Sequence, residues 1–183
     1  MLGEPQRDEA LVHFQRGLVL EQANRVDEAV EEYRRAPAHN PHLAEAHDAL
    51  GSYYQRQGLL AKAAEEFRIV ANLEGGFLAY FNIGCVLIEL ERYDEAIDAF
   101  LHCLAVDADD PAVHYELGQA NYLRGDNYAA LYHLQIARSR YPNDCEIHRL
   151  IGNCHLRLGA YDEAEAAFQA ALHHTKYEST RHR

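Results

Sequence analysis

Apolar side chains recur along this chain with the spacing of one face of an α-helix. Around residue 84, the apolar or small residues at positions 80, 83, 84 and 87 form a single stripe of a helix. A second stripe of the same kind runs through residues 93–104, after a short polar turn. A β-strand would need alternation with a period of two, and these positions do not alternate. The pattern therefore predicts two amphipathic helices joined by a turn.

This helical pair occurs five times. A glycine recurs at intervals of 34, 33, 34 and 34 residues by subtraction, an alanine follows each glycine after twelve residues, and an aromatic residue or leucine follows each alanine after four. Repetition at this period is typical of a solenoid, whose units bury their apolar faces against their neighbours. Small residues allow helix axes to approach closely, so we predict that the two helices of a pair cross at these positions. They are Gly17, Gly51, Gly84, Gly118, Gly152, Ala29, Ala63, Ala96, Ala130 and Ala164.

Turn residues mark the ends of the predicted helices. Residues that tolerate the left-handed backbone of a C-terminal cap fall where the first helices should stop, at Asn24, Gly58, Gly125 and Gly159. Pro37 lies inside the expected last turn of a second helix, and proline disfavours helical backbone at the preceding residue. We therefore expect that helix to end near Arg35 or to bend there.

The repeated unit resembles the tetratricopeptide repeat, which has the same period, glycine, alanine and aromatic residue. Segments such as LGSYYQRQGLLAKAAEEF and IGCVLIELERYDEAIDAF carry the resemblance, which covers residues 10–175. It implies an all-α fold, a right-handed α-solenoid of helix-turn-helix repeats forming a superhelix. It divides the chain into an N-terminal lead-in, five repeats and a polar tail: 1–9, 10–43, 44–76, 77–110, 111–144, 145–175 and 176–183.

Charge and composition narrow the classes of partner. The net charge is -12, from 29 acidic and 17 basic side chains, and a nucleic-acid partner is disfavoured because phosphate binding needs clustered lysine and arginine. No apolar run approaches the roughly 18 residues of a membrane span, so no membrane insertion is expected. The N-terminus lacks the layout of a secretory signal, which favours a cytoplasmic protein. The four cysteines form no C-x-x-C pair and are interpreted as reduced apolar fillers.

Histidine stands four residues before the glycine in four of the five repeats, at positions 13, 47, 114 and 148. Equivalent positions in neighbouring hairpins are about 10 Å apart, whereas zinc ligands lie about 2 Å from the ion, so no metal site is predicted. We expect these rings to be buried and neutral, so that stability falls as the pH drops through about 6.5. No phosphate-binding loop, G-x-S-x-G or H-E-x-x-H motif is present, so neither catalytic residues nor cofactors are predicted.

In the family that the chain resembles, the first helices of successive repeats line a concave groove. Transferred by position, the resemblance implies a partner-binding groove with an aromatic middle and charged flanks, a composition typical of a recognition surface. Its residues are Phe14, Leu18, Leu78, Phe81, Cys85, Ile88, Tyr115, Gln119, Tyr122, Arg149, Asn153 and Arg157.

The sequence thus predicts a non-enzymatic scaffold or adaptor that holds a peptide segment or helix of a protein partner in the groove. One alternative is a chaperone for secreted or assembling subunits. The other is a structural unit that forms homo-oligomers through the last repeat, which would leave Phe168, Ala171 and Leu172 exposed.

Overall fold

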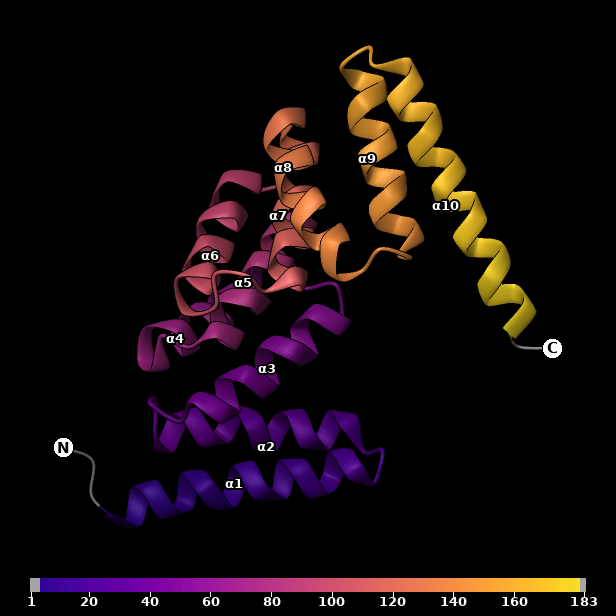
Figure 1. The fold of residues 1–183 in the computed structure, drawn as a ribbon. Helices are drawn as coiled ribbons and strands as arrows, with labels where there is room; N and C mark the ends of the chain where they lie inside the picture. Colours follow the sequence, from indigo (N-terminus) through magenta and orange to yellow (C-terminus); the bar gives the residue numbers. More distant parts are fainter. Residues whose placement is uncertain (1–3, 182–183) are drawn as a thin grey trace. The chain divides into compact units, whose positions relative to one another are not determined.

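The computed structural model describes residues 4–181, which form ten helices and contain no strand (Figure 1). The predicted all-α helical repeat fold is confirmed. The chain divides after Leu90 into two compact units, the first with α1–α5 and the second with α6–α10. The helices are α1 (Glu4–Gln22), α2 (Val26–His39), α3 (Ala44–Arg56), α4 (Leu60–Glu74), α5 (Phe77–Glu89), α6 (Tyr93–Val106), α7 (Pro111–Arg124), α8 (Asn127–Arg140), α9 (Cys145–Arg157) and α10 (Tyr161–Arg181).

The glycines of the repeat lie against a large side chain of the following helix. A Cβ atom added at Gly51 would lie 2.7 Å from Cε1 of Phe67, well inside van der Waals contact. Only a residue without a side chain lets the ring occupy this place. The same pairing occurs in four hairpins: Gly17 with Tyr33, Gly51 with Phe67, Gly118 with Leu134 and Gly152 with Phe168.

The alanines twelve residues further along are all buried. Their exposed fractions are 3% or less, so each faces the interior of the array. The glycine, the alanine and the large side chain therefore form the packed centre of a hairpin, with close packing comparable to that of other protein interiors. The alanines are Ala29, Ala63, Ala96, Ala130 and Ala164.

The predicted turn residues do adopt the left-handed backbone conformation. The φ angles at these positions lie between 58° and 99°, a region that glycine and asparagine tolerate best. They are Asn24, Gly58, Gly125 and Gly159. Side-chain caps begin α7, α8 and α9, where the carboxylates of Asp110, Asp126 and Asp144 accept hydrogen bonds from backbone N–H groups of the first turn.

Of the two expectations for this helix, an end or a bend near Arg35, the end is wrong, because α2 continues to His39 with Pro37 inside it. Proline removes one N–H donor, which would have bonded the carbonyl four residues earlier. That loss falls in the last turn, where the N–H of Asn40 donates to the carbonyl of Ala36 at 2.9 Å and closes the helix. One missing bond at a helix end is tolerated more easily than one in the interior.

The helices also extend into both predicted end segments. Helix α1 begins at Glu4, so residues 4–9 of the expected lead-in continue into the first repeat. Helix α10 runs to Arg181, so most of the expected polar tail has a helical backbone. The remaining parts of these two segments, residues 1–3 and 182–183, lie outside the described residues.

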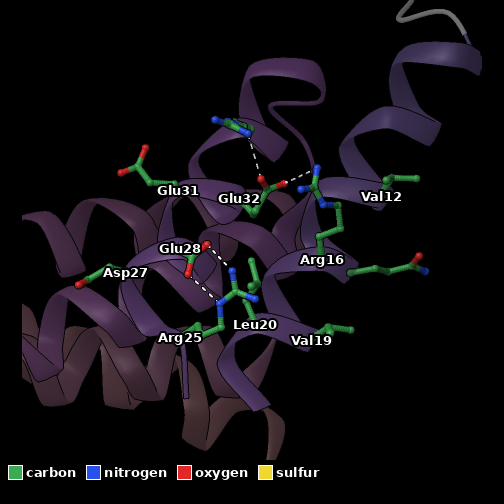
Figure 2. A pocket seen from close by; sticks show the side chains of 11 residues that line it. Val12, Arg16, Val19, Leu20, Arg25, Asp27, Glu28, Glu31 and Glu32 are labelled. Carbon is green, nitrogen blue, oxygen red and sulfur yellow. Dashed lines mark hydrogen bonds and ion pairs between the residues drawn. The ribbon is translucent and has the colours of Figure 1, made fainter. Parts of the chain in front are cut away.

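The outer face of the first hairpin carries a hollow of about 760 Å³ between α1 and α2 (Figure 2). Glu32 at its edge accepts from Arg35 at 2.9 Å and pairs with Arg16 at 3.5 Å. Val12 and Val19 beside it are 52% and 65% exposed. The positions equivalent to Val12 in the other four repeats are buried, namely Ala46, Ala79, Val113 and Ile147.

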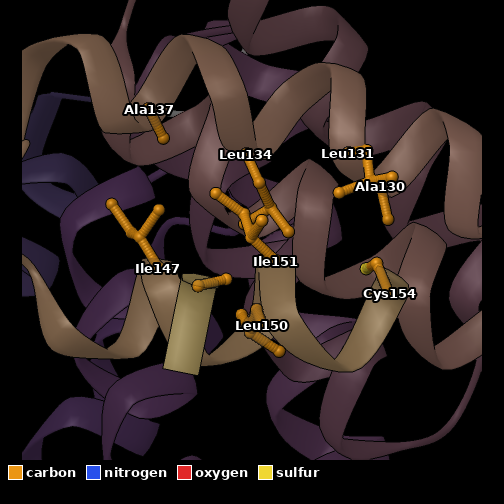
Figure 3. Close-up of a cluster of buried hydrophobic side chains, with 9 residues drawn as sticks. Ala130, Leu131, Leu134, Ala137, Ile147, Leu150, Ile151 and Cys154 are labelled. Carbon is orange, nitrogen blue, oxygen red and sulfur yellow. The ribbon is translucent and has the colours of Figure 1, made fainter. Parts of the chain in front are cut away.

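In the second unit, apolar residues from α8 and α9 form a buried cluster (Figure 3). Leu134 on α8 is fully buried, and Ile147 and Ile151 on α9 are 2% exposed or less. These α9 residues stand at the first-helix positions that also carry Val113 and Leu117 on α7. The second helix of one repeat thus packs on the first helix of the next, as expected for stacked repeats.

Candidate functional site

The first unit contains a hollow of about 680 Å³ lined by residues of α1 to α5. Three of its lining residues, Phe14, Leu18 and Leu78, belong to the predicted groove, and Asp48 on α3 lines the hollow as well. The other lining residues are Glu21, Tyr33, Ala44, Glu45, Ala49, Ser52, Arg56, Val70, Glu74, Gly76, Phe77, Ala79 and Asn82.

Apolar side chains on two helices of this hollow are open to solvent. Leu18 on α1 is 40% exposed and Leu78 on α5 is 72% exposed. Phe14 is half-buried, with its ring 5.8 Å from that of Tyr33. Apolar side chains exposed in a concave hollow are suited to taking an apolar group of a partner out of water.

Glu21, at one side of the hollow, is held by two donors. Arg56 donates to its Oε1 at 3.1 Å, and the hydroxyl of Tyr33 donates to its Oε2 at 2.8 Å. Burial raises the pKa of Tyr33, and the hydrogen bond to Glu21 raises it further, so the phenol stays protonated and continues to donate. Glu21 and Arg56 thereby link α1 to α3 across the groove face.

Asp48 lines the hollow and has no basic ion-pair partner among the described side chains, those of residues 5–173. Its carboxylate is half-buried, and this loss of solvent raises its pKa. The amide of Asn82 donates to Oδ1 of Asp48 at 3.3 Å, and this hydrogen bond lowers the pKa of Asp48. Because the contact is long, the carboxylate keeps most of its capacity to accept further donors.

The other predicted groove residues of the first unit, Phe81, Cys85 and Ile88, are half-buried and do not line the hollow. Phe81 stacks on Phe77, with ring centroids 6.0 Å apart and planes inclined by 9°. Sequence reasoning missed the contributions of Val70 and Glu74 on α4 and of Phe77 at the start of α5. The short joint at Gly75–Gly76 was the available signal, because it places the end of α4 beside the start of α5.

In the second unit, Arg157 on α9 covers one face of Tyr122 on α7. Its guanidinium carbon lies 3.8 Å from the ring centroid, and its Nη1 donates to the backbone carbonyl of Tyr122 at 2.8 Å. This cation–π contact ties consecutive first helices together. Tyr122 also packs against the buried cluster, so part of its surface is used within the protein.

Four predicted groove residues remain: Tyr115, Gln119, Arg149 and Asn153. Tyr115 packs against the buried cluster of the second unit, and burial raises the pKa of its hydroxyl to about 12. Arg149 is exposed and donates from Nε to the carboxylate of Glu146 at 2.8 Å. Gln119 and Asn153 are half-buried on α7 and α9. The second unit therefore presents a more polar face, whose aromatic rings are partly committed to packing.

The recurring histidines are hydrogen-bonded rather than simply packed. His47, His114 and His148 are buried, and Nε2 of each donates to the carbonyl six residues earlier, at 3.1, 3.1 and 2.8 Å. This contact holds the ring in place and assigns the Nε2 hydrogen. The expected burial of the ring is thus found in these three repeats, whereas His13 is half-buried.

The other ring nitrogen, Nδ1, faces the residue nineteen positions further on. His13 meets Glu32 at 2.7 Å and His47 meets Glu66 at 2.6 Å. Nδ1 of His47 thus faces a carboxylate oxygen of Glu66, while its Nε2 faces the carbonyl of Pro41. The carboxylate beside His47 is a contact that the sequence analysis did not predict.

The fourth repeat departs from this pattern, because Nδ1 of His114 faces Nδ1 of His133 at 2.9 Å. Since Nε2 of His114 carries its hydrogen, Nδ1 accepts and His133 donates. Burial lowers the pKa of His133 to about 4, and the neighbouring His114 lowers it in the same direction. His133 is a half-buried histidine on a second helix, which the sequence analysis did not consider.

Within residues 4–181, apart from the side chains at 4 and 174–181, the structure gathers no group of three or more histidine, cysteine, aspartate or glutamate side chains that could hold a metal ion. The cysteines at 85, 103, 145 and 154 form no disulfide. Burial raises the pKa of Cys103 and Cys154 to about 11, as expected for thiols that act as apolar fillers. None of the helices described is long and apolar enough to span a membrane.

Comparison with known families agrees with this repeated architecture. The family described as "Tetratricopeptide repeat" matches residues 6–44, 14–76 and 129–179, and that described as "TPR repeat" matches residues 84–125. The chain belongs to the tetratricopeptide repeat family. This family and fold are those of protein-interaction scaffolds, which are typically non-enzymatic.

The individual tetratricopeptide repeat proteins that match this chain have low sequence identity to it. TPR repeat-containing protein MJ1428 of Methanocaldococcus jannaschii is 27% identical over 114 residues, which are 62% of this chain and 20% of that protein. The match thus spans about a fifth of that relative. Among solved structures, MamA from Desulfovibrio magneticus RS-1 is similar with a TM-score of 0.85 at 18% identity, over 97% of this chain and 98% of that one. YrrB, described as a TPR protein with an unusual peptide-binding site, is similar with a TM-score of 0.83 at 16% sequence identity. The similarity covers 93% of this chain and 89% of YrrB.

Proposed function

We propose that this protein is a non-enzymatic adaptor that holds a peptide segment or helix of a protein partner in the groove of its first unit. The observation that carries this proposal is the hollow of about 680 Å³ with Leu18 and Leu78 exposed on its walls. Exposed apolar anchors surrounded by polar side chains are the usual composition of a binding hot spot. The peptide-binding site named for YrrB supports the same use of this fold.

The test starts from a displayed library of 12-residue peptides, selected on the purified protein. Replacing both Leu18 and Leu78 by serine should weaken the binding of enriched peptides by roughly tenfold or more, because the two side chains supply the apolar contact. Fluorescence anisotropy with labelled peptides measures the change. These leucines are better targets than Phe81 and Tyr115, since Tyr115 also packs against the core.

A matched control replaces Leu101 and Val106, which are 48% and 67% exposed on α6, by serine. This variant loses two exposed apolar side chains outside the groove and should bind the peptides like the wild type. Equal binding by the wild type and the Leu18 and Leu78 variant would show that the groove is not the contact surface.

Self-association is a second candidate, favoured by apolar surface on the last hairpin. Leu172 is 65% exposed and lines a hollow of about 330 Å³ with Phe168 and Ala171, both half-buried. The expected exposure of these three side chains is thus largest at Leu172. A second copy of the chain could cover this surface, since unpartnered apolar faces of terminal repeats favour association.

Light scattering over a range of concentrations tests this candidate. An oligomer that Leu172→Ser dissociates and Tyr161→Ser preserves would support it, because Tyr161 is also exposed on α10 but lies outside the hollow. A wild-type protein that stays monomeric at every concentration would eliminate self-association and leave the adaptor.

A further inference from the structure

We infer that the groove of the first unit selects a partner segment that carries lysine or arginine next to apolar residues. This inference rests on the proposed function and adds the chemistry of the ligand. Four carboxylates line the hollow, from Glu21, Glu45, Asp48 and Glu74, against the single guanidinium of Arg56. The only basic side chain of the site is already paired with Glu21 at 3.1 Å. The remaining three carboxylates carry a charge that no described residue neutralises.

Asp48 is the carboxylate best placed to recognise a cation. It is half-buried, and it accepts a hydrogen bond at 3.3 Å from the amide of Asn82, which carries no charge. A carboxylate that has lost solvent without gaining an ion pair gains most from an incoming ammonium or guanidinium group. Binding of such a group would replace the solvent that the fold has removed.

Comparison between repeats shows that this aspartate is not required by the fold. Asp48 occupies the position that carries Phe14, Phe81, Tyr115 and Arg149 in the other repeats. Two neighbouring repeats of the same unit thus place an aromatic ring there, and their helices form equally. An acidic side chain at this point changes the groove surface without serving the hairpin, as expected for a residue that sets ligand choice.

The apolar walls fit the aliphatic part of the same ligand. Phe14 and Leu18 lie on α1 and Leu78 on α5, with Asp48 on α3 between them in the order of first helices. Lysine and arginine bury their methylene stems on apolar surface while the charged head reaches polar groups. The net charge of -12 also attracts cationic segments before contact. The occupant is therefore a basic amphipathic peptide segment of a protein partner.

The experiment compares three labelled 12-residue peptides with identical apolar residues and with lysine and arginine, glutamine, or glutamate at the polar positions. Fluorescence anisotropy in 150 mM NaCl gives the dissociation constants. The basic peptide should bind roughly tenfold more tightly than the neutral one, and the acidic peptide should bind least. A scrambled basic peptide, which keeps the charge and loses the apolar register, should lose most of this affinity.

Variants that remove charges from the hollow test which carboxylates cause the preference for basic peptides. Glu45→Gln with Asp48→Asn should bring the basic and neutral peptides to within about twofold of each other. The control Glu65→Gln with Asp98→Asn removes the same charge from exposed positions outside the hollow and should preserve the preference. Circular dichroism melts confirm that both double variants remain folded.

The outcomes separate this inference from the proposed function. Equal binding of basic and neutral peptides, still weakened by serine at Leu18 and Leu78, would overturn the ligand chemistry and leave the groove as the binding surface. Tight binding of the scrambled peptide, or a preference that survives Glu45→Gln with Asp48→Asn, would also overturn it. If no peptide binding responds to Leu18 and Leu78, the proposed function itself is wrong.

Discussion

Replacing Gly51 by alanine is expected to lower the free energy of unfolding by about 1–3 kcal/mol, because the added Cβ would meet the ring of Phe67 at 2.7 Å. Alanine has a higher helix propensity than glycine by about 1 kcal/mol, so propensity alone predicts the opposite sign. Phe67 is 1% exposed, and close packing in a protein interior limits how far a buried ring can shift. Chemical denaturation of the purified variant measures the change.

Two further variants show whether the contact with Phe67 is the cause. Gly76→Ala places a Cβ where no atom lies within 4 Å and should leave the stability nearly unchanged. Phe67→Ala should cost about 3–5 kcal/mol by itself, but adding Gly51→Ala to it should cost little more, because the clash is gone. Strict additivity of the two substitutions would contradict the placement of the helix crossing at Gly51.

The stability of the protein is expected to fall by about 2 kcal/mol between pH 7 and pH 4 through His133. Its pKa is about 4 in the folded protein and returns to the ordinary value of 6.5 on unfolding. Below pH 6.5 the unfolded chain therefore takes up a proton that the folded chain refuses, so the contribution is complete above pH 7 and disappears as the pH falls. The ring is only half-buried, so solvent screens its charge. The expected loss of stability is therefore smaller than the full pKa shift would give.

The residues at the equivalent position of the other repeats suggest which substitutions of His133 test this prediction. Position 133 is equivalent to Glu32 and Glu66, which face histidine, and to Ala99 and Ala167. His133→Ala should remove the acid-sensitive contribution. His133→Glu should reverse its sign, because a carboxylate beside His114 favours the protonated ring and stabilises the fold as the pH falls from 7 to 5.

Melting temperatures of the three proteins between pH 7.5 and pH 4.5 provide the measurement. The groups that face His133 are His114, which is hydrogen-bonded to it, and Tyr132, whose ring is in edge contact at 5.0 Å. Parallel curves for the wild type and the His133→Ala variant would show that this pair does not control the response to acid. His133→Glu also separates the pair from acidic residues elsewhere, whose titration is common to all three proteins.

Much of the hairpin could be predicted from spacing alone. Gly51 and Phe67 are sixteen residues apart in a pattern that repeats, and two helices joined by a short turn bring such positions together whatever the surrounding sequence. The left-handed turns at Asn24 and Gly58 follow from the backbone freedom of those residue types. These features depend on local geometry, which the chain specifies within about 34 residues.

The site was less predictable, because it depends on which side chains share a surface. Phe81 stands at a groove position of its helix, yet it stacks on Phe77, and Tyr122 is covered by Arg157 from the next repeat. The pairing of His47 with Glu66 carried a signal, since glutamate recurs nineteen residues after histidine in the first two repeats. The neighbours of Asp48 had no such signal.

The sequence by itself determined the family, the all-α repeat fold, the turns, and the small residues at each helix crossing, because a period of 34 residues constrains local backbone and packing in the same way five times. Only the tertiary structure decided that α2 passes through Pro37, that His114 meets His133, and that Asp48 lies half-buried without a cation. These features depend on contacts between helices and on the solvent that each contact removes, and neither quantity is periodic along the chain.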